Sequence, residues 1–180
     1  RNDSGGTFTD ISAELTGVED GSSSWGDYDG DGDLDLIVTG FDNSFNRTAT
    51  IYRNDGGGTF AGISAELTGV EGGSSSWGDY DGDGDLDLVV TGFDGSDPAA
   101  TIYENDVANG NGFSPIGAGL TSVSLGSSTW GDYDNDGDLD LVVTGRDSGG
   151  TATIYENGAA PPSIAVDQGG TSISDGDTFD

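Results

Sequence analysis

The residues with the clearest chemical potential are aspartates that alternate with other residues in three short segments. The first segment reads Asp-Tyr-Asp-Gly-Asp-Gly-Asp-Leu-Asp over residues 27–35. It recurs over residues 79–87, and again over residues 132–140 with Asn135 in place of the first glycine. Carboxylates at this density would repel one another strongly. The pattern therefore predicts a bound cation in each segment and not a bare acidic turn.

A tight loop of this kind can wrap its aspartates around one ion. Side chains at the first, third and fifth positions converge, and glycine at the sixth position permits the sharp turn. The seventh aspartate offers its main-chain carbonyl and is expected to turn its side chain to water, while the ninth closes the shell. The predicted ligands are Asp27, Asp29, Asp31, Asp33, Asp35, Asp79, Asp81, Asp83, Asp85, Asp87, Asp132, Asp134, Asp136, Asp138 and Asp140.

Calcium is the predicted ion, with one site in each loop. Hard carboxylate and carbonyl oxygens in a flexible loop, allowing about six to eight contacts, suit Ca²⁺ better than Mg²⁺, which requires a small octahedron and keeps its waters. The chain has no histidine, cysteine or lysine. Zinc sites of the thiolate type, disulfides, Ser-His-Asp or Cys-His catalysis and Schiff-base chemistry are therefore excluded. We predict that the chain is not an enzyme.

The elements that position these loops belong to an internal repeat. Trp25, Trp77 and Trp130 follow one another at intervals of 52 and then 53 residues, a period typical of propeller blades. Each unit contains segments rich in Val, Ile, Thr and Tyr that are bounded by Gly, Asp and Asn, and none has a helical period. The sequence predicts an all-β chain of three four-stranded blades, each with its acidic loop before an apolar strand.

That apolar strand is expected to be covered on both faces. Leu34, Leu36 and Val38 face one side and Ile37 the other, as in a sheet stacked between neighbours. Propellers close with about four to eight blades, so three blades leave two outer faces uncovered. Either further blades outside this span or a second copy of the chain would cover them. We favour the former, because the opening of the chain copies residues 53–60 without the preceding strand.

The repeats are expected to end at about residue 157. The three units cover about residues 1–53, 54–104 and 105–157. Paired prolines at residues 158–162 predict a linker, because proline cannot continue a β-ladder. Residues 163–180 are predicted to be the start of a β-sandwich or a strand tail.

The flanks of the acidic loops distinguish among families that share such loops. An EF-hand would place Glu at the twelfth position and helices on both sides, but Val38, Val90 and Val143 stand there, within predicted strands. The blocks at residues 25–40, 77–92 and 130–145 resemble the FG-GAP or VCBS repeat family. That resemblance implies calcium-binding blades like those of integrin α-subunits and of secreted bacterial proteins. The tail is similar to the opening of Ig-like anchor domains.

The net charge of the chain limits which molecules it can bind. With 34 acidic and 4 basic side chains the net charge is -30, which excludes nucleic acid and anionic membranes, and no apolar run is long enough for membrane insertion. We predict a secreted, extracellular or cell-surface module with a structural or adhesive role: a rigid spacer, a binding platform or a fibre subunit. Its partners would be a protein or glycan at the cell surface, or further copies of itself.

The alternative is an accessory carbohydrate-binding propeller of a secreted polysaccharide-degrading enzyme. The three tryptophans could form a sugar-binding platform, but packing between blades is the favoured interpretation of one large ring at the same place in every unit. Tyr52, Tyr103 and Tyr155 are interpreted as packed residues in the same way. Glu14 and Glu66 are expected to be surface residues and not an acid/base pair.

Overall fold

The computed structural model describes residues 6–110 and 112–158. Every regular element in these ranges is a β-strand, which confirms the all-β prediction. No helix in the described part of the chain is long and apolar enough to cross a membrane. Residues 159–162 of the predicted linker and the whole predicted tail at 163–180 lie outside the described residues.

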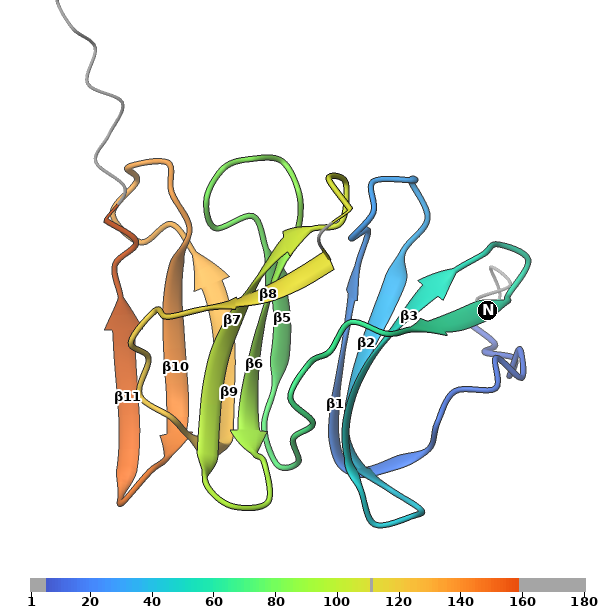
Figure 1. The fold of residues 1–180 in the computed structure, drawn as a ribbon, viewed down its shortest axis with the longest axis horizontal. Coiled ribbons are helices and arrows are strands. Elements are labelled where there is room, and N and C mark those ends of the chain that lie inside the picture. The colour runs from blue at the N-terminus through green and yellow to red at the C-terminus, as the bar shows by residue number, and fades with distance from the viewer. Residues whose placement is uncertain (1–5, 111, 159–180) are drawn as a thin grey trace, which may run out of the picture.

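The strands form three antiparallel sheets that stand side by side (Figure 1). The first sheet has the order β1 (Val18–Gly26), β2 (Asp35–Asp42), β3 (Arg47–Asn54) and β4 (Phe60–Ile63). The second has the order β5 (Ser75–Gly78), β6 (Asp87–Phe93), β7 (Pro98–Asp106) and β8 (Gly112–Ile116). The third has the order β9 (Ser124–Gly131), β10 (Asp140–Arg146) and β11 (Gly150–Tyr155).

We call the three sheets the first, second and third blades. The predicted four strands are present in the first two, whereas the described residues of the third blade supply three. Each acidic loop connects the first strand of its blade to the second, and all three loops lie at the same end of the stack, at the top of Figure 1. Equal register places each tryptophan opposite a leucine of the next strand, as in Trp25 and Leu36. The sheets therefore repeat one geometry three times.

The strand after each loop is buried on both faces in the first two blades, as predicted, whereas in the third blade Val142 on the outer face is only half-buried. In β2, Ile37 packs between the first and second blades, whereas Leu36 and Val38 pack on the opposite face of the first blade. Leu34 does not join them. The prediction for Leu34 was wrong because the strand begins one residue later, at Asp35, and Leu34 remains in the loop with 55% of its surface exposed.

Two apolar junctions hold the stack together. At the first junction Ile37 and Ile51 of the first blade face Leu88 and Val90 of the second. Equivalent residues build the second junction: Val89, Ile102, Leu141 and Val143. All of these side chains are buried, and burying an aliphatic side chain of this size stabilises a fold by about 1.5–3 kcal/mol. Stacking of the blades is thus a main source of stability.

Two blade faces lie outside these junctions. The outer face of the third blade carries Ile154, which is 58% exposed, although its counterpart Ile51 is fully buried at the first junction. At the other end, the ring of Trp25 is 57% exposed. No strand pairing among the described residues joins the first blade to the third. The structure thus leaves Ile154 at one end of the stack and Trp25 at the other without a covering blade, although Leu36 and Val38 on the outer face of the first blade are buried.

Candidate metal centres

Each acidic loop brings three carboxylates together. In every group, one carboxylate oxygen from each residue lies within 4.8 Å of the others. The groups are Asp27, Asp29 and Asp31 in the first loop, Asp79, Asp81 and Asp87 in the second, and Asp132, Asp134 and Asp136 in the third. Such clusters of hard oxygen donors can hold a divalent cation.

In the first cluster, the carboxylate of Asp27 has one buried oxygen without a hydrogen-bond donor. Its Oδ2 accepts a hydrogen bond from the backbone N–H of Gly32 at 3.0 Å. Its Oδ1 is buried but accepts no hydrogen bond. A buried carboxylate oxygen without a donor is costly, and a cation between Asp27, Asp29 and Asp31 would satisfy it. The donor set therefore fits a hard metal ion.

The loop backbone is shaped for this convergence. Gly30 and Gly32 have φ angles of 71° and 92°, a left-handed conformation that glycine adopts without steric cost. In the third loop Asn135 takes the place of the first glycine with φ of 64°, which asparagine tolerates better than most side chains. Backbone N–H groups also bond aspartates within the loop, as from Asp33 to Asp31 Oδ1 at 2.8 Å. These bonds fix the carboxylates before any ion arrives.

The ninth aspartate of each loop anchors the loop to its blade. Asp35 is fully buried. Its Oδ2 accepts the backbone N–H of Tyr28 at 3.2 Å, and its Oδ1 accepts that of Asn54 at 2.7 Å. Each carboxylate oxygen retains a second lone pair for a metal. The ninth aspartate can thus connect an ion to two elements of its own blade.

The same two bonds recur in the other blades. Asp87 accepts the backbone N–H groups of Tyr80 and Asn105 at 3.1 and 2.8 Å, and Asp140 accepts those of Tyr133 and Asn157 at 3.0 and 2.9 Å. The sequence predicted these aspartates as ligands but missed their bonds to the backbone.

Electrostatics at the second loop favour a cation. Burial, with a contribution from the carboxylates of Asp81 and Asp83, raises the pKa of Asp87 to about 6 against the bonds from Asn105 and Tyr80. Burial also raises the pKa of Asp81. These shifts show that the ionised carboxylates are disfavoured without a nearby positive charge. A divalent ion would supply that charge.

The loops differ in which predicted ligands they bring together. The first and third loops unite the first, third and fifth aspartates as predicted, whereas the second unites the first, third and ninth. Asp33, in the seventh position of the first loop, is exposed as expected, but its counterparts Asp85 and Asp138 are half-buried. Main-chain ligation by these three residues stays a prediction.

An asparagine from the next blade supports the first and second loops. Asn105 Nδ2 donates to the carbonyl oxygen of Tyr28 in the first loop at 2.8 Å, and to that of Leu86 in its own blade at 3.0 Å. Asn157 Nδ2 donates to the carbonyl oxygen of Tyr80 in the second loop. This support was missed in the sequence, although an asparagine two residues after the strand tyrosine recurs in every unit.

Aromatic rings connect the same loops to the following blade. Tyr28 stacks on Trp77 with ring centroids 6.3 Å apart, and Tyr80 stacks on Trp130 at 6.5 Å. The indole N–H of Trp77 donates to the carbonyl oxygen of Ser24 at 3.3 Å, across the junction. The predicted packing of tryptophans between blades is confirmed for Trp77 and Trp130.

The strand tyrosines serve their own blades. Tyr52 and Tyr103 are buried, and Tyr155 is half-buried. Each hydroxyl oxygen accepts a backbone N–H from the segment that enters the same blade, as from Thr16 to Tyr52 at 3.0 Å. Their prediction as packed residues is confirmed. Glu14 and Glu66 are exposed, as expected for surface residues.

Comparison with known proteins adds one positive finding. The profile of the family described as FG-GAP-like repeat matches residues 27–90 and again residues 79–143. Together these matches cover more than half of the chain, and each runs from one acidic loop into the strand that follows the next acidic loop. No curated protein and no solved structure matches significantly.

Proposed function

This chain belongs to the FG-GAP-like repeat family, and on that premise we propose that it is a calcium-binding structural module of a secreted or cell-surface protein. One Ca²⁺ in each acidic loop would fix that loop to its own blade and to the next. The blades would then form a rigid platform or spacer. Its partners would be a protein or a glycan at the cell surface.

The buried, unpaired Oδ1 of Asp27 is the observation that carries this proposal. It lies in a cluster of three carboxylates that recurs in each blade. Hydrogen bonds to the backbone already hold the ninth aspartates, so a metal bound beside them would be coupled to the blade. Binding of an ion to the folded state alone is stabilising.

The charge supports a location outside the cell. Calcium loops of extracellular modules bind with dissociation constants of about 10⁻⁴–10⁻³ M, so millimolar external calcium would fill them. A chain with a net charge of -30 resists compaction through self-repulsion. Three divalent ions would offset part of that repulsion at its densest points.

We propose support and binding as its role, without catalysis. The chain has no histidine, cysteine or lysine, and the matched family is described as a repeat. The alternative of a carbohydrate-binding accessory domain loses two of its three tryptophans, because the rings of Trp77 and Trp130 stack against tyrosines between blades and only the ring of Trp25 is exposed. Those rings do not offer a sugar platform.

Calcium titration of the chain by isothermal calorimetry tests the proposal. The expected result is three ions bound per chain, with Mg²⁺ binding more weakly. Asp29→Ala, Asp81→Ala and Asp134→Ala should each remove one site. Asp97→Asn, at an exposed turn outside the loops, is the matched control and should keep all three. Absence of saturable calcium binding would refute the proposal.

A further inference from the structure

The third blade differs from the others at its outer edge. In the first two blades a fourth strand pairs with the third, β4 with β3 and β8 with β7. Among the described residues, no strand pairs with the corresponding edge of β11. Because unpaired edges readily accept a further strand, this edge is a candidate docking site.

The fourth strand of the second blade also supplies a ring to the first junction. Phe113 of β8 packs against Tyr28 and Trp77, with ring centroids 5.8 and 6.1 Å away. This phenylalanine is buried. It fills the space beside the stacked pair of tyrosine and tryptophan.

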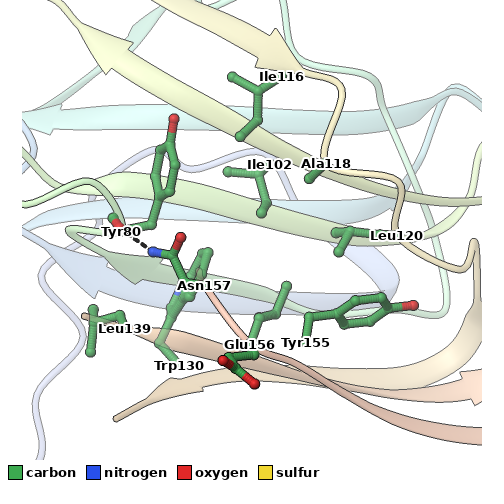
Figure 2. Close-up of a pocket in the computed structure, with 11 residues that line it drawn as sticks. Tyr80, Ile102, Ile116, Ala118, Leu120, Trp130, Leu139, Tyr155, Glu156 and Asn157 are labelled. Carbon is green, nitrogen blue, oxygen red and sulfur yellow. Dashed lines mark hydrogen bonds between the residues drawn. The ribbon is translucent and has the colours of Figure 1, made fainter. Parts of the chain in front are cut away.

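At the second junction the equivalent space is a cleft. It has a volume of about 300 Å³ and lies beside the stacked pair Tyr80 and Trp130 (Figure 2). Apolar side chains of Ile116 and Leu120 and the ring of Tyr155 also line it. No phenylalanine of the described third blade enters it. The cleft therefore has the surroundings of a phenylalanine site.

The N-terminal segment has the sequence of a fourth strand. Residues 7–15 differ from residues 59–67 at two of nine positions. The latter contain β4 and the segment that leads into the second blade. Phe8 takes the place of Phe60 in this comparison, but its ring is 80% exposed. A segment built like a fourth strand thus presents its phenylalanine to solvent.

The backbone of this segment already resembles that of its counterpart. Gly6 and Gly58 have φ angles of 73° and 86°, and Glu14 and Glu66 have φ angles of 54° and 51°. The residues before and after the strand sequence thus have the conformations of their counterparts, whereas Ser12 has a φ of 55° and its counterpart Ser64 does not have a positive φ. Preorganisation of this kind lowers the entropic cost of association.

We propose that the N-terminal segment of one copy of this chain completes the third blade of a second copy. Residues 8–11 of one copy add to the free edge of β11, and Phe8 enters the cleft beside Tyr80 and Trp130. Phe8 would then pack beside Tyr80 and Trp130 as Phe113 packs beside Tyr28 and Trp77 at the first junction. The proposal depends on these apolar contacts and not on the identity of the metal.

The same docking would cover the two outer faces. The chain that follows the N-terminal segment is the first blade, which would then pack on the third blade of the other copy as the second packs on the first. Tyr133, 55% exposed, would stack on Trp25. Asn54, whose Nδ2 bonds Leu34 O alone, would reach the carbonyl oxygen of Tyr133. These two contacts between copies would repeat the stack of Tyr28 on Trp77 and the hydrogen bond from Asn105 to Tyr28 at the first junction.

The contact joins the N-terminal segment of one copy to the third blade of another, so repeated contacts either close a ring or build an open filament. Two copies of three blades make six, within the range of closed propellers. A closed dimer with two identical junctions is the expected product.

Light scattering with size-exclusion chromatography tests this. The chain, 18.1 kDa as a monomer, is measured over a range of concentrations in calcium and physiological salt, which screens repulsion between acidic copies. The mass should double as concentration rises. Phe8→Ser and Ile154→Lys, on the two sides of the junction, should each weaken association at least tenfold.

Phe45→Ser is the matched control, because Phe45 is 79% exposed but lies in the turn between β2 and β3. It should associate like the unaltered chain. Mixing the Phe8→Ser and Ile154→Lys chains restores one intact junction and should give a one-to-one dimer that neither chain forms alone.

The opposite results overturn the proposal. A chain that stays monomeric at all concentrations would show that the edge of β11 does not take up the N-terminal segment of a second copy. Association that Phe8→Ser leaves unchanged would place the contact elsewhere. A mixture that stays monomeric would show that the two substitutions do not lie on opposite sides of one junction.

Discussion

The internal junctions and the outer face of the third blade use the same residue types in different surroundings. Ile51 and Ile102 are buried at the two junctions, whereas Ile154, at the same place in the third blade, is mostly exposed. The strands around all three isoleucines pair in equal register. A blade can therefore keep its strand pairing with one face open, and the burial of a residue depends on the junction more than on the sheet.

The acidic loops also differ according to whether another blade packs against them. The first and second loops receive a hydrogen bond from an asparagine of the next blade and a stacked tryptophan. The described residues offer the third loop neither contact. Tyr133 instead donates its hydroxyl to Glu156 at 3.1 Å. We expect the third loop to be the least rigid of the three and its metal site the weakest.

Calcium removal should have the largest effect on the stack. Calcium at about 10 mM would be roughly 10–100 times the expected dissociation constants of about 10⁻⁴–10⁻³ M, and would stabilise the folded state by about 1.4–2.7 kcal/mol for each site. Chelation should lower the urea midpoint accordingly, and the third site should empty first as free calcium falls. Urea titrations with calcium, with chelator and with Mg²⁺ as control check this. An unchanged midpoint after chelation would contradict it.

The matched pair Ile51→Ala and Ile154→Ala compares a junction with the outer face directly. Loss of a buried isoleucine side chain costs about 2–5 kcal/mol, so we expect Ile51→Ala to lower the free energy of unfolding by that amount. Ile154→Ala should stay within about 0.5 kcal/mol in dilute solution, where copies are apart. Urea unfolding measures both. Equal losses would mean that the outer face is covered within one chain.

Gly26 and Gly131 form a second matched pair. A Cβ at Gly26 would lie 2.7 Å from ring atoms of Trp77, whereas one at Gly131 would have nothing within 4 Å. Overpacking of this kind costs about 1–3 kcal/mol. Gly26→Ala should therefore lower the melting temperature, and Gly131→Ala should not. A similar loss in both variants would show that the glycine serves the loop and not the junction.

The smallest expected effect concerns the asparagine support. Asn105→Ala removes hydrogen bonds to the carbonyl oxygens of Tyr28 and Leu86 and should cost about 1 kcal/mol. It should also weaken calcium binding at the first loop, measured by calorimetry. Asn54→Ala, measured in dilute solution where copies are apart, removes a side-chain bond to Leu34 within one blade and is the control. If both variants bind calcium alike, the support from the next blade does not reach the metal.

Much of this architecture could be predicted from periodicity. The strand after each acidic loop is apolar at successive positions, and that pattern indicates burial on both faces. The recurring tryptophan predicted packing between blades because a large ring in every unit needs a neighbour. Both features depend on local sequence and on the repeat itself.

The contacts that cross a junction could not be derived in the same way. Asn105 and Tyr28 are 77 residues apart, and nothing in either residue alone shows that an amide will meet that carbonyl. Leu34 was assigned to a strand because it continues the alternation of Leu36 and Val38. Its neighbour Asp35 instead ends the loop, since its buried carboxylate binds two backbone N–H groups.

Trp25 differs from Trp77 and Trp130 in one further respect. Its indole ring is mostly in water and stands 6.0 Å from Phe60, while the other two indoles donate to carbonyl oxygens across the junctions. Trp25 should therefore emit at the longest wavelength of the three and be the most accessible to a soluble quencher. The chain contains its own fluorescent reporter, which signals whether the open end of the stack is occupied.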